Sequence, residues 1–206
     1  MTKILLIRHA LTDSVGKSLS GRTPGIHLND EGRKQASGLA SFLRDVKIDA
    51  IYSSPLERTM ETAEEIACPH NLKIISSGDF LEIDFGNWTN LGTKELRDDP
   101  GFGSFNMFRS GTRIPGGELM YEAQMRIVSG LHKICENHKD QVVAVVSHAD
   151  LIRSAIAWFT GIPLDMMNRI EISPASVSII EIYNSSAKLM LLNCCKGNME
   201  KNLPVQ

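Results

Sequence analysis

Residues 141–148 read Gln-Val-Val-Ala-Val-Val-Ser-His, and this stretch decides the fold. Its five consecutive apolar residues predict a short strand that is buried on both faces. A strand of that kind requires helices on both sides of its sheet. Apolar residues at helical spacing do flank it, at Ala123, Ile127, Leu131 and Ile134 before it and at Leu151, Ile152, Ala155, Ile156 and Phe159 after it.

The rest of the chain continues this alternation of strands and helices. Further strands are predicted at residues 3–7, 49–53, 72–75, 177–183 and 188–193, the last two joined by a turn at 184–186. Apolar stripes predict helices after the first two of these strands, and Ser54, Pro55 and Glu57 resemble an N-cap, a first helical residue and a capping box. We therefore predict an α/β fold, a three-layer α/β/α sandwich whose central sheet is mostly parallel.

Length and composition favour one domain. The 206 residues, 42% of them apolar, suffice for one sizeable core, so we predict a single domain over residues 1–206. Between about residues 86 and 117 the periodicity gives way to Gly, Arg and aromatic residues. This segment is predicted to be an irregular, lid-like insertion.

Charge and hydropathy narrow the classes of partner. The 22 Lys and Arg nearly balance the 24 Asp and Glu, so no overall field would attract nucleic acid or a membrane surface. The apolar run at residues 4–7 is too short for a signal peptide, and no run of about 18 apolar residues occurs. We expect a cytoplasmic protein without nucleic-acid or membrane partners. A homodimer through an exposed edge of the final strands stays open.

Candidate chemical groups follow the predicted strands. Arg8 and His9 follow the first, Arg58 lies just beyond the second, and His148 ends the valine-rich strand. The carboxyl ends of parallel strands share one edge of a sheet, and guanidinium groups there would bind a phosphomonoester dianion. Their positive charge would keep His9 neutral, as a nucleophile must be. Glu82, among apolar neighbours, is the best candidate for a proton donor.

Six segments in order resemble the histidine phosphatase superfamily, which includes the cofactor-dependent phosphoglycerate mutases, and the resemblance covers nearly the whole chain. The matching segments are Arg8-His9-Ala10-Leu11-Thr12, residues 28–36, Ser53-Ser54-Pro55-Leu56-Glu57-Arg58-Thr59, Glu82 with Phe85-Gly86-x-Trp88, Pro115-Gly116-Gly117-Glu118, and Val146-Ser147-His148.

The resemblance implies a phosphoglycerate mutase-like fold and assigns a role to each matching residue. His9 would accept the phosphoryl group, while Glu82 would protonate the leaving oxygen and then activate water. The residues implied to hold the phosphoryl group are Arg8, Arg58, His148 and Ala149. This chemistry needs neither a metal nor a cofactor, so we expect none. The implied activity is a histidine acid-type phosphatase acting on a small phosphorylated metabolite.

Three departures from the family pattern bear on this function. Ala10 stands where Gly is usual, which is tolerable at negative φ. Val15 stands where the family has a phosphate-contacting Asn, and Ser14 or Ser18 are the candidates to replace that contact. The acid motif reads Glu-Ile-Asp-Phe-Gly, and the chain is shorter than the mutases; both points favour a phosphatase over a mutase.

Three arginines are candidates for further substrate contacts: Arg22, Arg109 and Arg113. Each is equally or better explained as a solvated charge. The remaining histidines show no metal-binding spacing. Two alternatives to the phosphatase remain: a cofactor-dependent phosphoglycerate mutase and a non-catalytic module that binds a phosphorylated ligand. The sequence does not identify the phosphomonoester.

Overall fold

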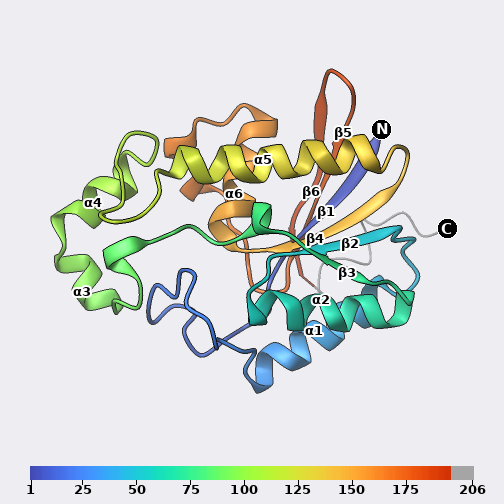
Figure 1. Cartoon of the computed structure of the whole chain (residues 1–206), viewed down its shortest axis with the longest axis horizontal. Coiled ribbons are helices and arrows are strands. Elements are labelled where there is room, and N and C mark those ends of the chain that lie inside the picture. Colours follow the sequence, from blue (N-terminus) through green and yellow to red (C-terminus); the bar gives the residue numbers. More distant parts are fainter. Residues whose placement is uncertain (196–206) are drawn as a thin grey trace.

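A computed structural model describes residues 1–195 of the chain as a six-stranded sheet with helices on both faces (Figure 1). The strand order is β3-β2-β4-β1-β5-β6. Strands β1 to β4 run parallel, whereas β5 and β6 are antiparallel additions at one edge. The strands are β1 (Thr2–Arg8), β2 (Ala50–Ser53), β3 (Ile74–Ser76), β4 (Val142–Ser147), β5 (Val177–Ile182) and β6 (Ala187–Cys194). The mostly parallel sheet confirms the predicted fold class.

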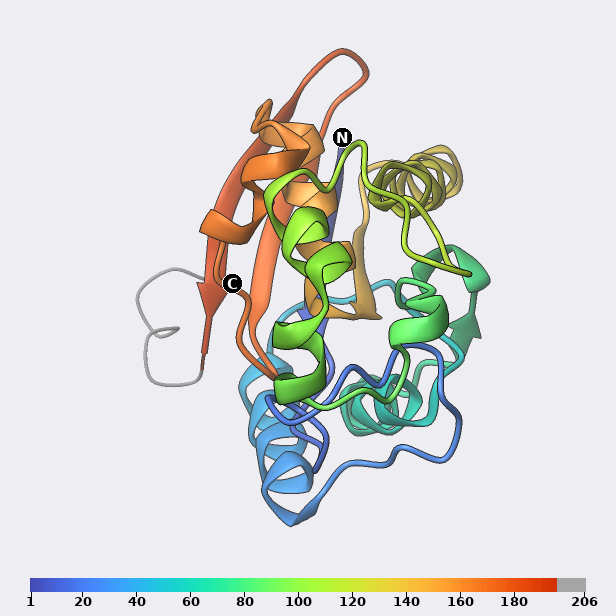
Figure 2. The same cartoon turned by 90° about the vertical axis from the view of Figure 1, so that its left-hand side faces the viewer.

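The longer helices form the two outer layers. One face of the sheet packs against α1 (Asp30–Leu43) and α2 (Glu57–His70), and the other against α5 (Met120–Asn137) and α6 (Ala149–Thr160). Figure 2 shows these layers from the side. Shorter helices complete the chain: η1 (Gly78–Phe80), η2 (Gly86–Trp88), α3 (Thr93–Asp98), α4 (Pro100–Met107) and η3 (Leu164–Arg169).

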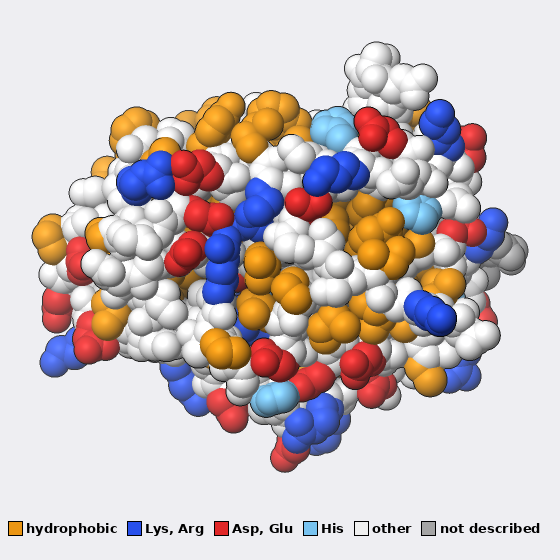
Figure 3. All heavy atoms as spheres, viewed as in Figure 1, with side chains coloured by type: hydrophobic (Ala, Val, Ile, Leu, Met, Phe, Trp, Pro, Cys, Tyr) orange, Lys and Arg blue, Asp and Glu red, His pale blue; other side chains and the backbone are white. Residues whose placement is uncertain are grey.

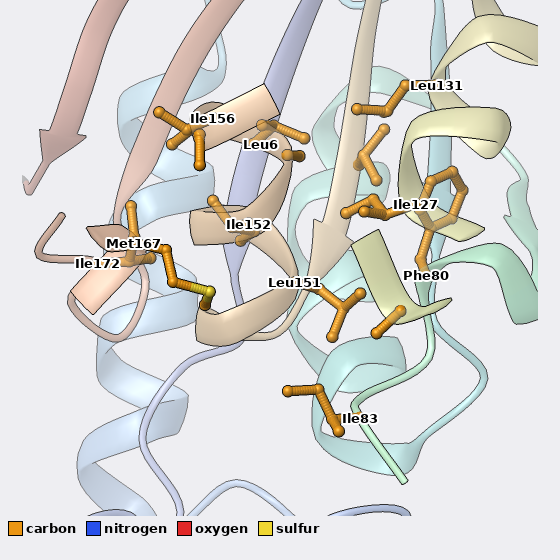
Figure 4. Close-up of a cluster of buried hydrophobic side chains, with 14 of the residues drawn as sticks. Leu6, Phe80, Ile83, Ile127, Leu131, Leu151, Ile152, Ile156, Met167 and Ile172 are labelled. Carbon is orange, nitrogen blue, oxygen red and sulfur yellow. The ribbon is translucent and has the colours of Figure 1, made fainter. Parts of the chain in front are cut away.

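Strand β4 has the two-sided burial that its sequence predicts. Val143 and Val145 pack into the core beneath α5 and α6, while Ala144 and Val146 pack into the core beneath α1 and α2. Figure 4 shows the first of these cores, where Ile152 of α6 lies near Leu6 of β1. Two apolar cores on opposite faces hold the carboxyl ends of β1, β2 and β4 at one edge.

Two predictions of local structure are wrong. Helix α2 begins at Glu57 with Leu56 as its N-cap, because the Ser54 side chain is hydrogen-bonded to His148 instead of capping the helix. The segment at 86–117 is not irregular, since it contains η2, α3 and α4. Asp99 caps α4 through the amides of Gly101 and Phe102, and the indole of Trp88 donates to the same carboxylate. These side-chain contacts create helices that periodicity does not reveal.

The distribution of charged side chains on the surface agrees with the nearly equal numbers of basic and acidic residues in the sequence. On the face shown in Figure 3, basic and acidic side chains lie interspersed. Strand β6 forms an exposed edge of the sheet, as predicted, and its Met190 and Leu192 are exposed. Whether two copies pair there stays a prediction. No helix within residues 1–195 has the length and hydropathy needed to cross a membrane.

Candidate active site

A cleft of about 260 Å³ lies at the carboxyl ends of the parallel strands. It brings together most of the residues singled out from the sequence: Arg8, His9, Arg58, Glu82, Arg109 and Ala149 line it. Three predicted residues do not line it. His148 lies buried behind the cleft wall, and Arg22 and Arg113 lie to the side. Most of the reactive residues that were predicted from their positions after the strands therefore lie together at this edge of the sheet.

The loop that carries His9 is fixed by helix α1. The Gln35 side chain accepts a hydrogen bond from the Leu11 amide at 3.1 Å, and the Leu11 carbonyl accepts one from the Asn29 amide at 3.1 Å. A Cβ at Gly32 would lie 2.0 Å from that carbonyl oxygen, so only glycine allows the helix to approach this closely. The segment 28–36 thus positions the residues after His9, and Ala10 occurs without a positive φ.

His9 is held as a neutral imidazole with one free nitrogen. Its Nδ1 lies 2.7 Å from the Ala10 carbonyl, which can only accept a hydrogen bond, so Nδ1 carries the proton and Nε2 the lone pair. Burial, followed by the charges of Arg58 and Arg8, lowers its pKa to about 3. His9 is therefore a neutral imidazole, with Nε2 unprotonated, throughout the neutral pH range, as a nucleophile must be.

Arg58 and His148 form a buried pair beside His9. Arg58 Nη2 donates to the Gly21 carbonyl at 2.8 Å and approaches His148 Nδ1 at 3.3 Å. Since arginine only donates, His148 Nδ1 is the acceptor, and its Nε2 donates to Ser54 Oγ at 2.9 Å. Burial, then the charge of Arg58, lowers the pKa of His148 well below its usual value. His148 is neutral in this arrangement.

Three arginines that line the cleft each have one buried guanidinium nitrogen without a partner. Arg58 Nη1, Arg8 Nε and Arg109 Nε have no hydrogen-bond partner among residues 1–195. Arg8 is itself anchored by a 2.7 Å bond from Nη1 to the Ile172 carbonyl. Unpaired buried donors are costly, and guanidinium donors in general pair well with phosphoryl oxygens.

The carboxyl group of Glu82 has a pKa near neutral pH. Burial, with a smaller contribution from the nearby charge of Asp150, raises its pKa to about 7. Its Oε1 accepts a bond from the Ile83 amide at 2.9 Å, and its Oε2 lies 3.8 Å from His148 Nδ1. Glu82 can thus donate a proton in one step and accept one in the next at neutral pH.

Backbone packing fixes the segment that carries Glu82. A Cβ at Gly86, which has φ +45°, would lie 2.3 Å from the Pro115 carbonyl oxygen, and a Cβ at Gly117 would lie 2.2 Å from that of Asp84. The Glu118 amide donates to the Asp84 carbonyl at 3.0 Å. These contacts explain the glycines at positions 86 and 117, because the backbones of the two segments touch there.

The Arg22 side chain holds the backbone of Glu82 in place. Arg22 Nε donates to the Glu82 carbonyl at 2.9 Å, and its Nη2 donates to Glu118 Oε1 at 2.7 Å. Arg126 donates from the other side, to the carbonyl of Leu81 at 2.8 Å. In this structure Arg22 positions the acid and does not face the cleft. Arg113 is exposed and paired with Glu122, outside the cleft.

Asp150, an acidic residue that the sequence analysis did not single out, lines the cleft among its arginines. Asp150 Oδ2 accepts from Arg109 Nη1 at 3.0 Å, and its Oδ1 accepts from Arg153 Nη1 at 2.8 Å. Burial alone would raise the pKa of Asp150, but these two arginines hold it below its ordinary value. Position alone could have revealed Asp150, because it lies in the first turn of the helix that follows His148.

Hydroxyl groups line the cleft around Val15. Ser20 Oγ donates to Ser14 Oγ at 2.7 Å, which lies 2.9 Å from Thr12 Oγ1. Ser18 also lines the cleft, so both residues suggested as replacements for the missing Asn are near it. Within residues 1–195, no three His, Cys, Asp or Glu side chains form a group that could hold a metal.

Known proteins resemble the chain in sequence and structure. The family model described as histidine phosphatase superfamily (branch 1) matches residues 4–195. Phosphoserine phosphatase 1 of Hydrogenobacter thermophilus is 32% identical over 94% of this chain and 92% of its own length. A phosphoserine phosphatase of Entamoeba histolytica, solved as a mutant with phosphoserine, has a TM-score of 0.86 at 25% identity, covering 97% of this chain and 100% of that one. The α-ribazole phosphatase of Shigella flexneri has a TM-score of 0.83 at 26% identity, covering 93% of this chain and 96% of that one.

Proposed function

The chain belongs to the histidine phosphatase superfamily, and on that premise we propose that it is a metal-independent phosphatase that hydrolyses a small phosphomonoester through a phosphohistidine on His9. One observation carries this proposal. The free Nε2 of a neutral His9 lies in the same cleft as Glu82, whose pKa of about 7 suits a general acid. A nucleophile and a proton donor thus face one anion-binding cleft.

In the first step, His9 Nε2 attacks phosphorus while the bond from phosphorus to the ester oxygen breaks. The leaving oxygen takes the proton of the Glu82 carboxyl group and departs as an alcohol. The Ala10 carbonyl continues to accept the Nδ1–H bond, which stabilises the positive charge on the phosphorylated ring. Arg58 and Arg8 neutralise the phosphoryl oxygens.

In the second step, Glu82 is a carboxylate and takes a proton from water. The water oxygen attacks phosphorus, the bond to His9 Nε2 breaks, and inorganic phosphate leaves. Glu82 is again protonated and His9 again neutral, so atoms and charges balance over the cycle. The pKa of about 7 is suited to both directions of proton transfer.

His148 changes its hydrogen bonding when the phosphoryl group enters. In the free protein its Nδ1 accepts from Arg58 and cannot donate to an anion. A phosphoryl dianion nearby would raise the proton affinity of the imidazole, and a proton on Nδ1 would then bind a phosphoryl oxygen. Ser54 holds the other nitrogen throughout.

The substrate is a small phosphorylated metabolite. Relatives named for phosphoserine and for α-ribazole phosphate support that class. The helix amide of Ala149, at the start of α6, adds a donor beside the basic residues of the cleft.

The test is phosphate release from a panel of small phosphomonoesters in the presence of a chelator. Wild type should release phosphate, and His9→Ala should not. His27→Ala, which removes an exposed histidine remote from the cleft, should behave like wild type. A reaction quenched in alkali should contain a phosphohistidine, since that bond is acid-labile and base-stable.

Two outcomes would replace the proposal. Interconversion of 2- and 3-phosphoglycerate with a bisphosphoglycerate primer, without net phosphate release, would make the protein a mutase. Tight binding of phosphate esters without phosphohistidine or turnover would make it a binding module. Activity that disappears on chelation would overturn the metal-independent mechanism.

A further inference from the structure

A second hollow, of about 470 Å³, adjoins the catalytic cleft. Its walls are the loop around residues 16–19 and the helices α3 and α4, which lie at the front of Figure 2. The apolar part of the wall is Leu19, Leu96 and Phe102, and Asn106 and Arg97 add polar groups. Its volume is typical of a pocket for a small organic molecule.

The hollow and the cleft share lining residues, so the two spaces lie next to each other. Gly16, Ser18 and Leu19 line both. Asn106, which lines the hollow, accepts a 2.8 Å hydrogen bond from Arg109, which lines the cleft. A molecule with its phosphoryl group beside His9 could therefore extend into the hollow.

The wall between the two spaces is fixed by backbone hydrogen bonds. Leu19 donates to the Leu91 carbonyl at 3.1 Å and accepts from the Asn90 amide at 2.7 Å. The Thr93 amide at the start of α3 donates to the Lys17 carbonyl at 3.1 Å. Three backbone hydrogen bonds tie the loop to α3 and to the residues just before it, so the hollow is a formed pocket.

We propose that this hollow binds the alcohol part of the substrate, and that the preferred substrates are phosphomonoesters whose alcohol carries an apolar group about the size of a ring system. The inference rests on the proposed phosphatase function and specifies its substrate class. A compact substrate fills only the 260 Å³ cleft and leaves the hollow unused. A ring-bearing alcohol would cover the half-buried side chains of Leu19 and Phe102 and remove them from water.

Gly103 offers a direct way to fill the hollow. It lines the hollow from α4, and a Cβ built on it meets no atom within 4 Å. Gly103→Leu therefore places a side chain in the hollow without a clash in the fold, and leucine favours the helix more than glycine does. Ser104→Leu adds the same side chain at the next position, which is exposed and does not line the hollow. Thermal unfolding checks that both variants fold.

Binding of two uncleavable phosphonates tests the inference separately from catalysis. Wild type should bind naphthylphosphonate at least about tenfold more tightly than methylphosphonate, which corresponds to burial of roughly 60 Å² of apolar surface. Inorganic phosphate should displace both ligands from the cleft. Gly103→Leu should reduce the preference to about twofold or less, and Ser104→Leu should retain it.

The outcomes separate this inference from the proposed function. If wild type binds the two phosphonates equally, or Gly103→Leu leaves the preference intact, the hollow does not bind the alcohol part, whatever the phosphate-release assay gives. If the preference depends on Gly103 but His9-dependent phosphate release is absent, the binding inference stands and the phosphatase proposal fails.

Discussion

Replacing Glu82 with glutamine should remove the high-pH decline of kcat/KM. In the first chemical step the leaving oxygen takes a proton from Glu82, so only enzyme with protonated Glu82 is competent. The pKa of this group, raised to about 7 by burial and by Asp150, sets the pH at which competence is lost. His9, with a pKa of about 3, is neutral throughout and adds no change above pH 4.

The size of the decline follows from that pKa. With a pKa of about 7, roughly one tenth of Glu82 is protonated at pH 8 and about one hundredth at pH 9. The value of kcat/KM should therefore fall about tenfold per pH unit above neutrality. The substrate phosphate, with a second pKa of about 6, accounts for a rise at lower pH. Glu82→Gln should lower the maximum by about 100- to 10,000-fold for an alkyl ester.

The assay is phosphate release at substrate concentrations well below KM, from pH 5 to 9.5, in buffers of constant ionic strength. An aryl ester with an acidic phenol should lose much less than an alkyl ester on Glu82→Gln, because its leaving oxygen needs little protonation. A wild-type profile that stays flat between pH 7 and 9 would refute the assignment of Glu82. Retention of the high-pH decline in Glu82→Gln would do the same.

Three further perturbations test the surroundings of the site. Asp150→Asn should move the high-pH decline of kcat/KM to lower pH, because the Asp150 charge helps to raise the pKa of Glu82, and pH-rate profiles measure the shift. Gly32→Ala should destabilise the fold by about 1–3 kcal/mol in urea unfolding and lower kcat, since its Cβ would collide with the Leu11 carbonyl, whereas Gly103→Ala should not. A folded-state pKa of Glu82 above its unfolded value means that its stabilising contribution is complete below about pH 4.5 and is lost as the pH rises through about 7. Between pH 4 and 8, the unfolding free energy of wild type should therefore fall by about 3 kcal/mol relative to that of Glu82→Gln.

Periodicity predicted the centre of the sheet because strands β1, β4 and β5 are buried on both faces. The Val-rich strand, the stripe on α1 and the final hairpin all occur near their predicted positions. Apolar spacing is a reliable signal where burial decides the structure. It failed at the start of α2 and over residues 86–117, where polar contacts decide: Ser54 binds His148, and Asp99 caps α4.

The reactive groups of the site could be placed from strand ends, but their supports could not. His9, Arg8 and Arg58 were predicted to converge, and the cleft contains them together. The pairing of Asp150 with Arg109 and the backbone role of Arg22 depend on which groups meet across the fold, at sequence separations of 41 and 60 residues. A single sequence does not encode such pairings in any local pattern.

The same cavity shifts the pKa values of His9 and Glu82 in opposite directions. The reason is that the charged form of histidine is a cation and that of glutamate is an anion. Burial disfavours the charged form of each, so it lowers the pKa of His9 and raises that of Glu82. The arginines that bind phosphate oppose burial at Glu82, because positive charge favours its carboxylate. A cleft basic enough for a dianion would therefore tend to ionise its own acid. Asp150 resolves this conflict: it pairs with Arg109 and Arg153 and raises the pKa of Glu82, while Arg8 Nε and Arg58 Nη1 stay unpaired among residues 1–195.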